Sequence, residues 1–238
     1  FNIDELYGYV SFEELPDYEQ QQTYSFVVSA TDGLFITDQN VIFELINEND
    51  NRPIFESPTS FDVDENQVDI GTISAIDADG TTVEYSLVSG DIEYFILDSL
   101  SGVLQFNGGN GSTPDYETKT SYSIKIKASD ETINGVEGND TEQDIVININ
   151  NLNDNSPEFT TYIFTVDENQ TSAGTLEASD ADGDTNITFS VSGADANLFN
   201  LNTQTGALTF KSAPDYETKK SFAVTFTAYD GANSTDID

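Results

Sequence analysis

The sequence predicts an all-β protein built of tandem β-sandwich repeats. Three observations support this prediction: short motifs recur with a period of roughly 100 residues, apolar and polar side chains alternate between the motifs, and no window carries an apolar stripe of helical period over three turns. Alternation with period two is typical of antiparallel strands that bury one face and expose the other. About seven short strands in a repeat of this length is the strand count of an immunoglobulin-like sandwich.

Four short motifs define the repeats. Asp-Tyr-Glu occurs three times, whereas Val-Asp-Glu-Asn, Asp-Ala-Asp-Gly and Asn-Asp-Asn each occur twice, and a proline follows two residues after each Asn-Asp-Asn. The copies lie at 17–19, 115–117 and 215–217, at 63–66 and 166–169, at 77–80 and 180–183, and at 49–51 and 153–155. Because several motifs share one period, composition bias does not explain them, and they indicate an array of single-domain repeats.

The expected strands are the segments of alternating apolar residues between these motifs. The longer segments lie at 41–45, 122–128, 145–149 and 222–228, and the shorter ones at 61–63, 83–87, 104–106, 187–191 and 208–210. Turn-forming pairs such as Asp79-Gly80, Ser101-Gly102 and Thr205-Gly206 separate the strands.

The order of the motifs also sets the domain boundaries. We expect the C-terminal half of one repeat at 1–46, a complete repeat at 54–150, and a repeat lacking its last strand at 158–238. Linkers at 47–53 and 151–157 join them. The last strand is expected to be missing from the third repeat because only eight residues follow Asp230.

The composition excludes several classes of site. The chain has 44 acidic residues against 7 basic ones, a formal net charge of -37, and no His, Cys, Met or Trp. It therefore has no disulfide, no thiolate or imidazole metal ligand and no His-dependent catalytic triad. The acid excess argues against binding to nucleic acid or anionic membranes. No apolar run approaches the ~20 residues that span a bilayer, so we expect no direct membrane insertion.

The acidic residues recur at matched offsets in the repeats, at strand ends and turns, without basic residues at matching positions. Carboxylates brought together in this way need a cation. Oxygen ligands without nitrogen or sulfur favour Ca²⁺ over Mg²⁺ or Mn²⁺, because Ca²⁺ accepts about six to eight mixed oxygen ligands in irregular geometry. The sequence therefore predicts Ca²⁺ sites where successive repeats meet.

The motif set resembles that of cadherin repeats over essentially the whole chain. Asp-x-Glu, Ala-x-Asp, Asn-Asp-Asn-x-Pro, x-Glu-Asn and Asp-Ala-Asp follow one another in the order found in this family. The resemblance implies Greek-key sandwiches of seven strands, with up to three Ca²⁺ ions between consecutive repeats. It also implies an extracellular, cell-surface or secreted protein that acts in adhesion, by homophilic or heterophilic protein contact.

For the boundary between the second and third repeats, the resemblance assigns oxygen ligands to side chains and to the backbone carbonyls of Leu152 and Asn155. The expected ligands are Glu65, Asp115, Glu117, Asn151, Leu152, Asn153, Asp154, Asn155, Asp180, Asp182 and Asp230. A carbonyl in the loop 184–186 is a further candidate. Three Ca²⁺ ions would nearly neutralise the seven carboxylates of this set.

At the boundary between the first and second repeats, the same roles fall on a matching set, with Glu48 acting through its carbonyl. These residues are Asp17, Glu19, Asn47, Glu48, Asn49, Asp50, Asn51, Asp77, Asp79 and Asp130. Two departures from the family pattern matter. The usual leading Asp of the linker is Asn47 here and Asn151 at the other boundary, and the first boundary has no counterpart of Glu65. We therefore expect weaker or missing ions at the first boundary.

A third set, Glu168, Asp215 and Glu217, matches only part of the pattern and is expected to be empty or weak. The leading hypothesis is a calcium-rigidified extracellular adhesion or stalk segment, in which the linkers become hinges without Ca²⁺ because like charges repel. The absence of Cys and the scarcity of Lys and Arg also favour a bacterial source over an animal one.

Two other classes of function are alternatives. A calcium-dependent carbohydrate-binding module would need an exposed aromatic platform, for which Tyr7, Tyr9 and Tyr94 are the candidates. An enzyme could use paired carboxylates, as glycosidases do. The acid pairs recur in every repeat, however, and an active site repeated at each boundary is improbable, so the sequence predicts no enzyme.

Overall fold

A computed structural model describes residues 1–108, 113–132, 135, 138–160, 163–183 and 185–238. It confirms the all-β class, because the described elements are antiparallel strands apart from short 3₁₀ helices. The chain divides into two compact units. Unit 1 comprises Phe1–Val63, Gln67–Thr113 and Ser121–Asn148, and unit 2 comprises Asp64–Asn66, Pro114–Thr120 and Ile149–Asp238. No helix among the described residues is long and apolar enough to cross a membrane.

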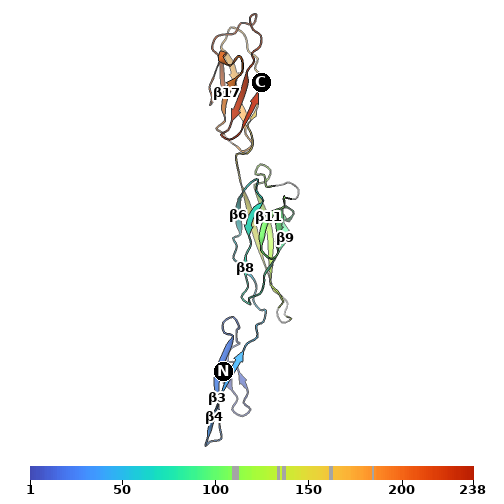
Figure 1. Cartoon of the computed structure of the whole chain (residues 1–238), viewed down its shortest axis with the longest axis vertical. Coiled ribbons are helices and arrows are strands. Elements are labelled where there is room, and N and C mark those ends of the chain that lie inside the picture. Colours follow the sequence, from blue (N-terminus) through green and yellow to red (C-terminus); the bar gives the residue numbers. More distant parts are fainter. Residues whose placement is uncertain (109–112, 133–134, 136–137, 161–162, 184) are drawn as a thin grey trace. The chain divides into compact units, whose positions relative to one another are not determined.

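The first repeat consists of two hairpins within unit 1 (Figure 1). Strand β1 (Asn2–Ile3) pairs with β2 (Val10–Ser11), and β3 (Thr23–Thr31) pairs with β4 (Ile36–Glu44) over nine residue pairs. Aromatic rings from both hairpins pack with centroids 4.7–5.9 Å apart. These rings belong to Phe1, Phe12, Tyr24, Phe26 and Phe43.

The second repeat has a four-stranded sheet in the order β6-β13-β12-β9, a three-stranded sheet in the order β10-β11-β7, and the pair β5-β8. Its elements are β5 (Ile54–Phe55), β6 (Ser60–Asp64), β7 (Asp69–Thr72), β8 (Ala75–Ile76), β9 (Glu84–Gly90), η1 (Ile92–Tyr94), β10 (Phe95–Leu97), β11 (Val103–Phe106), β12 (Ser121–Ser129) and β13 (Asp140–Asn150).

The core of the second repeat comes from alternate residues of its long strands. Ile124 and Ile126 of β12, together with Ile145 and Ile147 of β13, are at most 2% exposed. The residues between them face outward, where Lys125 forms an ion pair with Glu142. The period of two in the sequence therefore corresponds to one buried and one solvated face, as expected for a sandwich sheet.

The third repeat repeats this plan within unit 2. Its sheets have the orders β15-β19-β18 and β17-β20-β21, with the additional pair β14-β16. The elements are β14 (Glu158–Phe159), β15 (Ser172–Thr175), β16 (Ala178–Ser179), β17 (Thr188–Ser192), η3 (Ala196–Leu198), β18 (Phe199–Leu201), β19 (Ala207–Phe210), β20 (Thr225–Tyr229) and β21 (Ser234–Ile237). Phenylalanines and aliphatic residues of both sheets form one buried cluster.

The end of the third repeat requires a correction to the sequence prediction. A last strand was expected to be missing, yet β21 pairs with β20 from Tyr229↔Ser234 to Phe226↔Ile237. The loop before it is short: the Asp230 N–H donates to the Asn233 carbonyl, whereas the Asp130 N–H of the second repeat donates to Asn139. The strand therefore begins sooner after the aspartate than the second repeat suggested.

The structure also shortens the strand expected at 222–228. Strand β20 begins at Thr225, although Phe222 and Val224 still pack against the core. In the second repeat, β13 pairs with β12 along the whole length of β12, from Ser121 to Ser129. Strand β21 ends at Ile237 and reaches only Phe226 to Tyr229, so the earlier residues have no such partner there.

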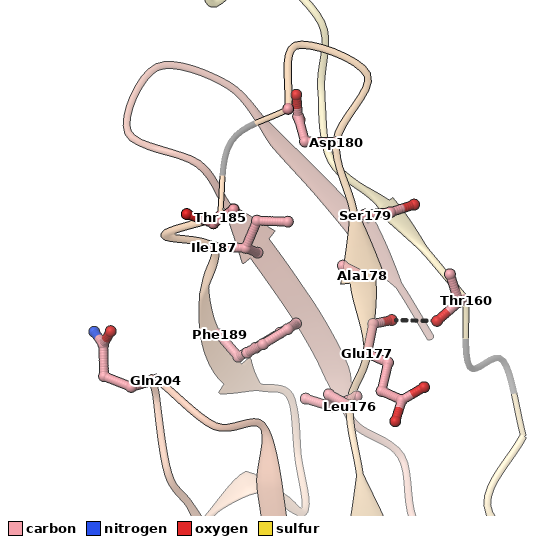
Figure 2. Close-up of a pocket in the computed structure, with 11 residues that line it drawn as sticks. Thr160, Leu176, Glu177, Ala178, Ser179, Asp180, Thr185, Ile187, Phe189 and Gln204 are labelled. Carbon is pink, nitrogen blue, oxygen red and sulfur yellow. Dashed lines mark hydrogen bonds between the residues drawn. The ribbon is translucent and has the colours of Figure 1, made fainter.

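One internal difference between the repeats lies beside a cleft in the third. Tyr85 and Phe189 are equivalent, because their N–H groups donate to Ser99 and Thr203 with the same length of 2.8 Å. The Tyr85 hydroxyl accepts a hydrogen bond from the Ala75 N–H at 2.7 Å. Phe189 has no hydroxyl and lines a cleft of about 620 Å³. Figure 2 shows its ring directed toward β16, which carries Ala178, the counterpart of Ala75.

Replacing each of these two residues by its counterpart, in separate variants, is expected to change the free energy of unfolding in opposite directions. Tyr85→Phe removes an acceptor from a part-buried N–H and should lower the free energy of unfolding by about 1–3 kcal/mol. Phe189→Tyr places a hydroxyl beside Ala178 and should raise it by about 0.5–1.5 kcal/mol. Urea unfolding of the two variants measures both effects. A neutral Tyr85→Phe together with a destabilising Phe189→Tyr would contradict this account.

Candidate metal centres

Glu65 is held in place by the backbone around it. It follows β6 directly and precedes Asn66, which adopts a left-handed conformation with φ of 66°. Asn tolerates this region better than most residues, and Asn169 takes the same conformation in the third repeat. The Glu65 side chain is only 3% exposed. Its two oxygens accept hydrogen bonds from the Tyr116 N–H at 2.8 Å and the Leu152 N–H at 2.7 Å. Glu65 thus joins three chain segments of unit 2.

Carboxylates gather around Glu65 in two overlapping groups. Oxygens of Glu65, Asp115 and Glu117 lie within 4.8 Å of one another, and so do oxygens of Glu117, Asp154 and Asp182. Glu117 belongs to both groups. Among the residues that the structure describes, none of these carboxylates forms an ion pair with Lys or Arg. The five expected ligands therefore form a compact anionic cluster within unit 2.

The proximity of these charges changes the pKa of Glu117. Partial desolvation, followed by the charges of Glu65 and Asp182, raises this pKa above the ordinary value of a glutamate. Asp115 behaves oppositely, because hydrogen bonds from Thr118 lower the pKa of its carboxyl. Two neighbouring carboxyl groups of one cluster therefore have pKa values shifted in opposite directions. A divalent cation would relieve the repulsion that raises the Glu117 value.

The linker turn is fixed by the same contact at both boundaries. The N–H and the side-chain amide of Asn155 donate to the two oxygens of Asp182 at 2.9 and 2.7 Å. Asn51 donates in the same way to Asp79, at 2.9 and 2.7 Å. The leading residue of the linker also makes the same contact at both boundaries: Asn151 donates to the Asp182 carbonyl and Asn47 to the Asp79 carbonyl, each at 2.8 Å. The two linkers therefore have equivalent local geometry.

The first boundary, within unit 1, gathers fewer carboxylates. Oxygens of Glu19, Asp50 and Asp79 lie within 4.8 Å of one another. Partial desolvation, followed by the charges of Asp79 and Asp50, raises the pKa of Glu19. Asp17 is not part of this group, and both of its oxygens accept hydrogen bonds from Gln20, at 3.0 and 2.7 Å. Its counterpart Asp115 also accepts hydrogen bonds at both oxygens, yet it is grouped with Glu65, for which the first boundary has no counterpart. Asp17 does line a cleft of about 250 Å³ that also holds Glu19, Glu48 and Asp50.

The remaining expected acids lie outside these carboxylate groups. Asp77 and Asp180 each accept a hydrogen bond in their own turns, from the N–H groups of Asp79 and Asp182. Asp130 and Asp230 hold equivalent positions after the penultimate strand of their repeats. The Oδ2 atoms of Asp130 and Asp230 are buried and accept no hydrogen bond from the described residues. Buried carboxylate oxygens without a partner are costly, so these donor atoms fit a hard cation. Asp184 of the loop 184–186 lies outside the described residues.

Sequence reasoning missed two asparagines at these sites. The side-chain amide of Asn139 donates to the Asn51 carbonyl at 2.9 Å, and that of Asn233 donates to Asn153 Oδ1 at 3.1 Å. The backbone N–H of each also donates to Asp130 or Asp230, both at 2.7 Å. A usable signal exists in the sequence, because both asparagines stand directly before the last strand of their repeat.

The third set of acids is present but more exposed. Oxygens of Glu168, Asp215 and Glu217 also lie within 4.8 Å of one another. Glu168 accepts a hydrogen bond from the Tyr216 N–H at 3.1 Å, as Glu65 does from Tyr116. All three side chains are exposed, in contrast to the buried Glu65.

Comparison with known proteins identifies similar chains. Residues 162–236 match the family model described as the cadherin domain. The human protein named Protocadherin Fat 1 is 30% identical over 230 residues, which are 90% of this chain and 5% of that protein. The human Cadherin EGF LAG seven-pass G-type receptor 2 is 30% identical over 97% of this chain and 8% of its own length. The chain thus spans a small part of the length of these relatives. The bacterial source stays a prediction.

Solved structures agree with these similarities. The crystal structure of mouse Cadherin-23 EC22-24 matches with a TM-score of 0.68 and 26% identity, covering 94% of this chain and 76% of that one. The fold of tandem sandwiches predicted from the sequence is therefore confirmed.

Proposed function

Because this chain belongs to the cadherin-repeat family, we propose that it is a calcium-binding, calcium-rigidified segment of an extracellular protein that acts in adhesion or as a stalk. The single observation that carries this proposal is the buried Glu65, which joins three segments of unit 2 and lies among carboxylates within 4.8 Å. Such a cluster is unfavourable without a cation, and its oxygen-only chemistry suits Ca²⁺.

The residues that would hold Ca²⁺ at the second boundary come from several short segments. They are Glu65, Asp115, Glu117, Asn151, Leu152, Asn153, Asp154, Asn155, Asp180, Asp182 and Asp230. Bound ions would supply charge neutralisation, and the protein would supply the fixed backbone that presents the ligands. The hydrogen bonds of Glu65 and the Asn155–Asp182 contact support this, because they position ligands before an ion arrives.

Ion binding at such a site has a mechanical consequence. Ligands contributed by the linker and by both flanking repeats become tied to common ions, so their relative motion is restricted. Without ions, the repelling carboxylates favour separation of these segments. Ca²⁺ modules outside cells bind at about 10⁻⁴ to 10⁻³ M, which suits a segment that is loaded outside the cell and empty inside it. Its partner would be another protein, of the same or a different kind.

The two boundaries are expected to differ in Ca²⁺ affinity. The first lacks a counterpart of Glu65, and among the described residues it gathers one group of carboxylates where the second boundary has two. Isothermal titration of the 238-residue chain with Ca²⁺ should therefore show a tighter class of sites that Asp182→Asn weakens about tenfold or more. Asp79→Asn, its matched control at the first boundary, should leave the tighter class unchanged. Equal effects of the two variants would contradict this assignment, and absence of binding at millimolar Ca²⁺ would refute the proposed function.

Small-angle scattering with and without EGTA tests the rigidity. We expect the distribution of chain dimensions to broaden on chelation. An unchanged profile, in a chain that binds Ca²⁺, would show that the ions do not restrict the linkers.

A further inference from the structure

The same six-residue turn occurs once in each repeat. It spans 4–9, 98–103 and 202–207, and it connects β1 with β2, β10 with β11, and β18 with β19. In each copy, the side chain of the first residue accepts two backbone hydrogen bonds, and the glycine at the fifth position donates to the first carbonyl at 2.7–3.0 Å. The glycines have φ of 70°, 69° and 68°. The backbone of the turn is therefore closely conserved within the chain.

The side chains on this turn differ between the repeats. Ser101 and Val103 occupy the fourth and sixth positions in the second repeat, and Thr205 and Ala207 occupy them in the third. In the first repeat these positions are Tyr7 and Tyr9, whose ring centroids lie 6.1 Å apart with the planes inclined by 35°. The first repeat thus carries a pair of neighbouring rings on a turn whose backbone is fixed by hydrogen bonds.

Both rings face solvent. Tyr7 is 71% and Tyr9 is 75% exposed. The equivalent positions are also exposed in the second and third repeats, at Ser101, Val103, Thr205 and Ala207. The orientation of the two tyrosines therefore follows from the turn itself and not from incomplete packing of the first repeat. None of the three repeats places a buried side chain at these two positions.

The chemistry of the surroundings limits what these rings could bind. Stacking on a pair of tyrosine faces suits flat or partly apolar ligands, and the hydroxyls add polar contacts. The neighbouring Asp4 and Glu5 are acidic, and the chain carries a net charge of -37. Nucleic acid and acidic glycans are disfavoured by this charge. A neutral sugar polymer combines apolar ring faces with hydroxyls that can donate to carboxylates, without a charge to repel.

We propose that Tyr7 and Tyr9 form a stacking platform for a neutral polysaccharide, separate from the metal centres. The platform uses rings held by a rigid turn, so little side-chain ordering is needed on binding. It goes beyond the proposed function, because it assigns a ligand to the first repeat that does not depend on Ca²⁺.

The test is a depletion assay of the full 238-residue chain on microcrystalline cellulose and on insoluble chitin. Tyr7→Ser with Tyr9→Val gives the turn the residues of its counterpart in the second repeat, so the turn should be retained. We expect retention of the unmodified chain on at least one polymer, and about a tenfold or greater loss of affinity in the double variant. EGTA should leave retention unchanged. Loss of binding in EGTA would overturn the proposal in favour of ion-bridged recognition.

A gain-of-binding variant guards against misfolding of the first repeat. Ser101→Tyr with Val103→Tyr, made in the chain that lacks the two native tyrosines, places the ring pair on the complete second repeat. Restored retention supports the platform. Failure of the unmodified chain to bind either polymer, or equal binding by all three chains, overturns it. So does sedimentation that shows self-association lost in the double variant, because the rings would then contact a second copy.

Discussion

Glu65→Gln is expected to remove the tight class of Ca²⁺ sites and to destabilise unit 2. Glu65 accepts two backbone hydrogen bonds while 3% exposed, and an amide side chain can accept only one of them. Hydrogen bonds to charged groups contribute about 1.5–3 kcal/mol, so a loss of about that size is expected in the free energy of unfolding. The affinity for Ca²⁺ should fall at least tenfold, because one ligand charge and one oxygen are lost. Calorimetric titration and urea unfolding measure the two effects.

The matched control is Glu168→Gln. Glu168 occupies the same position in the third repeat and accepts the equivalent hydrogen bond from Tyr216, but its side chain is exposed. Its replacement should leave the tight sites intact and cost well under 1 kcal/mol of stability. If both variants lost the tight sites equally, or if Glu65→Gln kept them, the central role of Glu65 in the cluster would be wrong.

The fold was readable from the sequence because its signals are local and repeated. The alternation around Ile124 and Ile145 places strands without knowledge of their partners, and the turn pairs mark their ends. What the sequence could not give was the length of individual strands. Phe222 has the same alternation as Tyr122, yet it precedes β20, because strand length depends on how far a neighbouring strand extends. The presence of β21 was also not predictable, because the loop before it is shorter than the loop before β13. The spacing of the aspartates does not show the length of this loop.

The candidate sites were predicted only in part. Motif register placed Glu65, Asp115, Glu117, Asp154 and Asp182 at one boundary, and the structure brings these five together. Asp17 belongs to no such group: its counterpart Asp115 is grouped with Glu65 and Glu117, and the first boundary has no counterpart of Glu65, which the motif register already indicates. Asn139 and Asn233 were overlooked because their role is to hold linker carbonyls and amides, and an asparagine beside a strand has many ordinary explanations.

Removal of Ca²⁺ is expected to have the largest effect on stability. A ligand present at 100 times its dissociation constant stabilises a protein by about 2.7 kcal/mol for each independent site. For a unit of about 100 residues such as unit 2, each kcal/mol corresponds to about 4–8 °C in the midpoint of thermal unfolding. The transition should therefore fall by about 10 °C or more when 10 mM CaCl₂ is replaced by EGTA at equal ionic strength. Mg²⁺ should restore little of it, because Mg²⁺ demands a regular octahedral site.

The dependence on pH distinguishes bound Ca²⁺ from general charge screening. Without Ca²⁺, protonation of Glu117 relieves its repulsion with the neighbouring carboxylates. Because folding raises the pKa of Glu117, the folded state binds this proton more tightly than the unfolded state does. The free energy of unfolding should therefore rise as the pH falls toward about 4.3. Below about 3.9 stability should fall again, because the lowered pKa of Asp115 means that folding favours its ionised form. With saturating Ca²⁺ the first trend should reverse, since protons then compete with ions for Glu117. The same rise on acidification in CaCl₂ and in EGTA, measured by thermal unfolding, would show that Glu117 holds no ion.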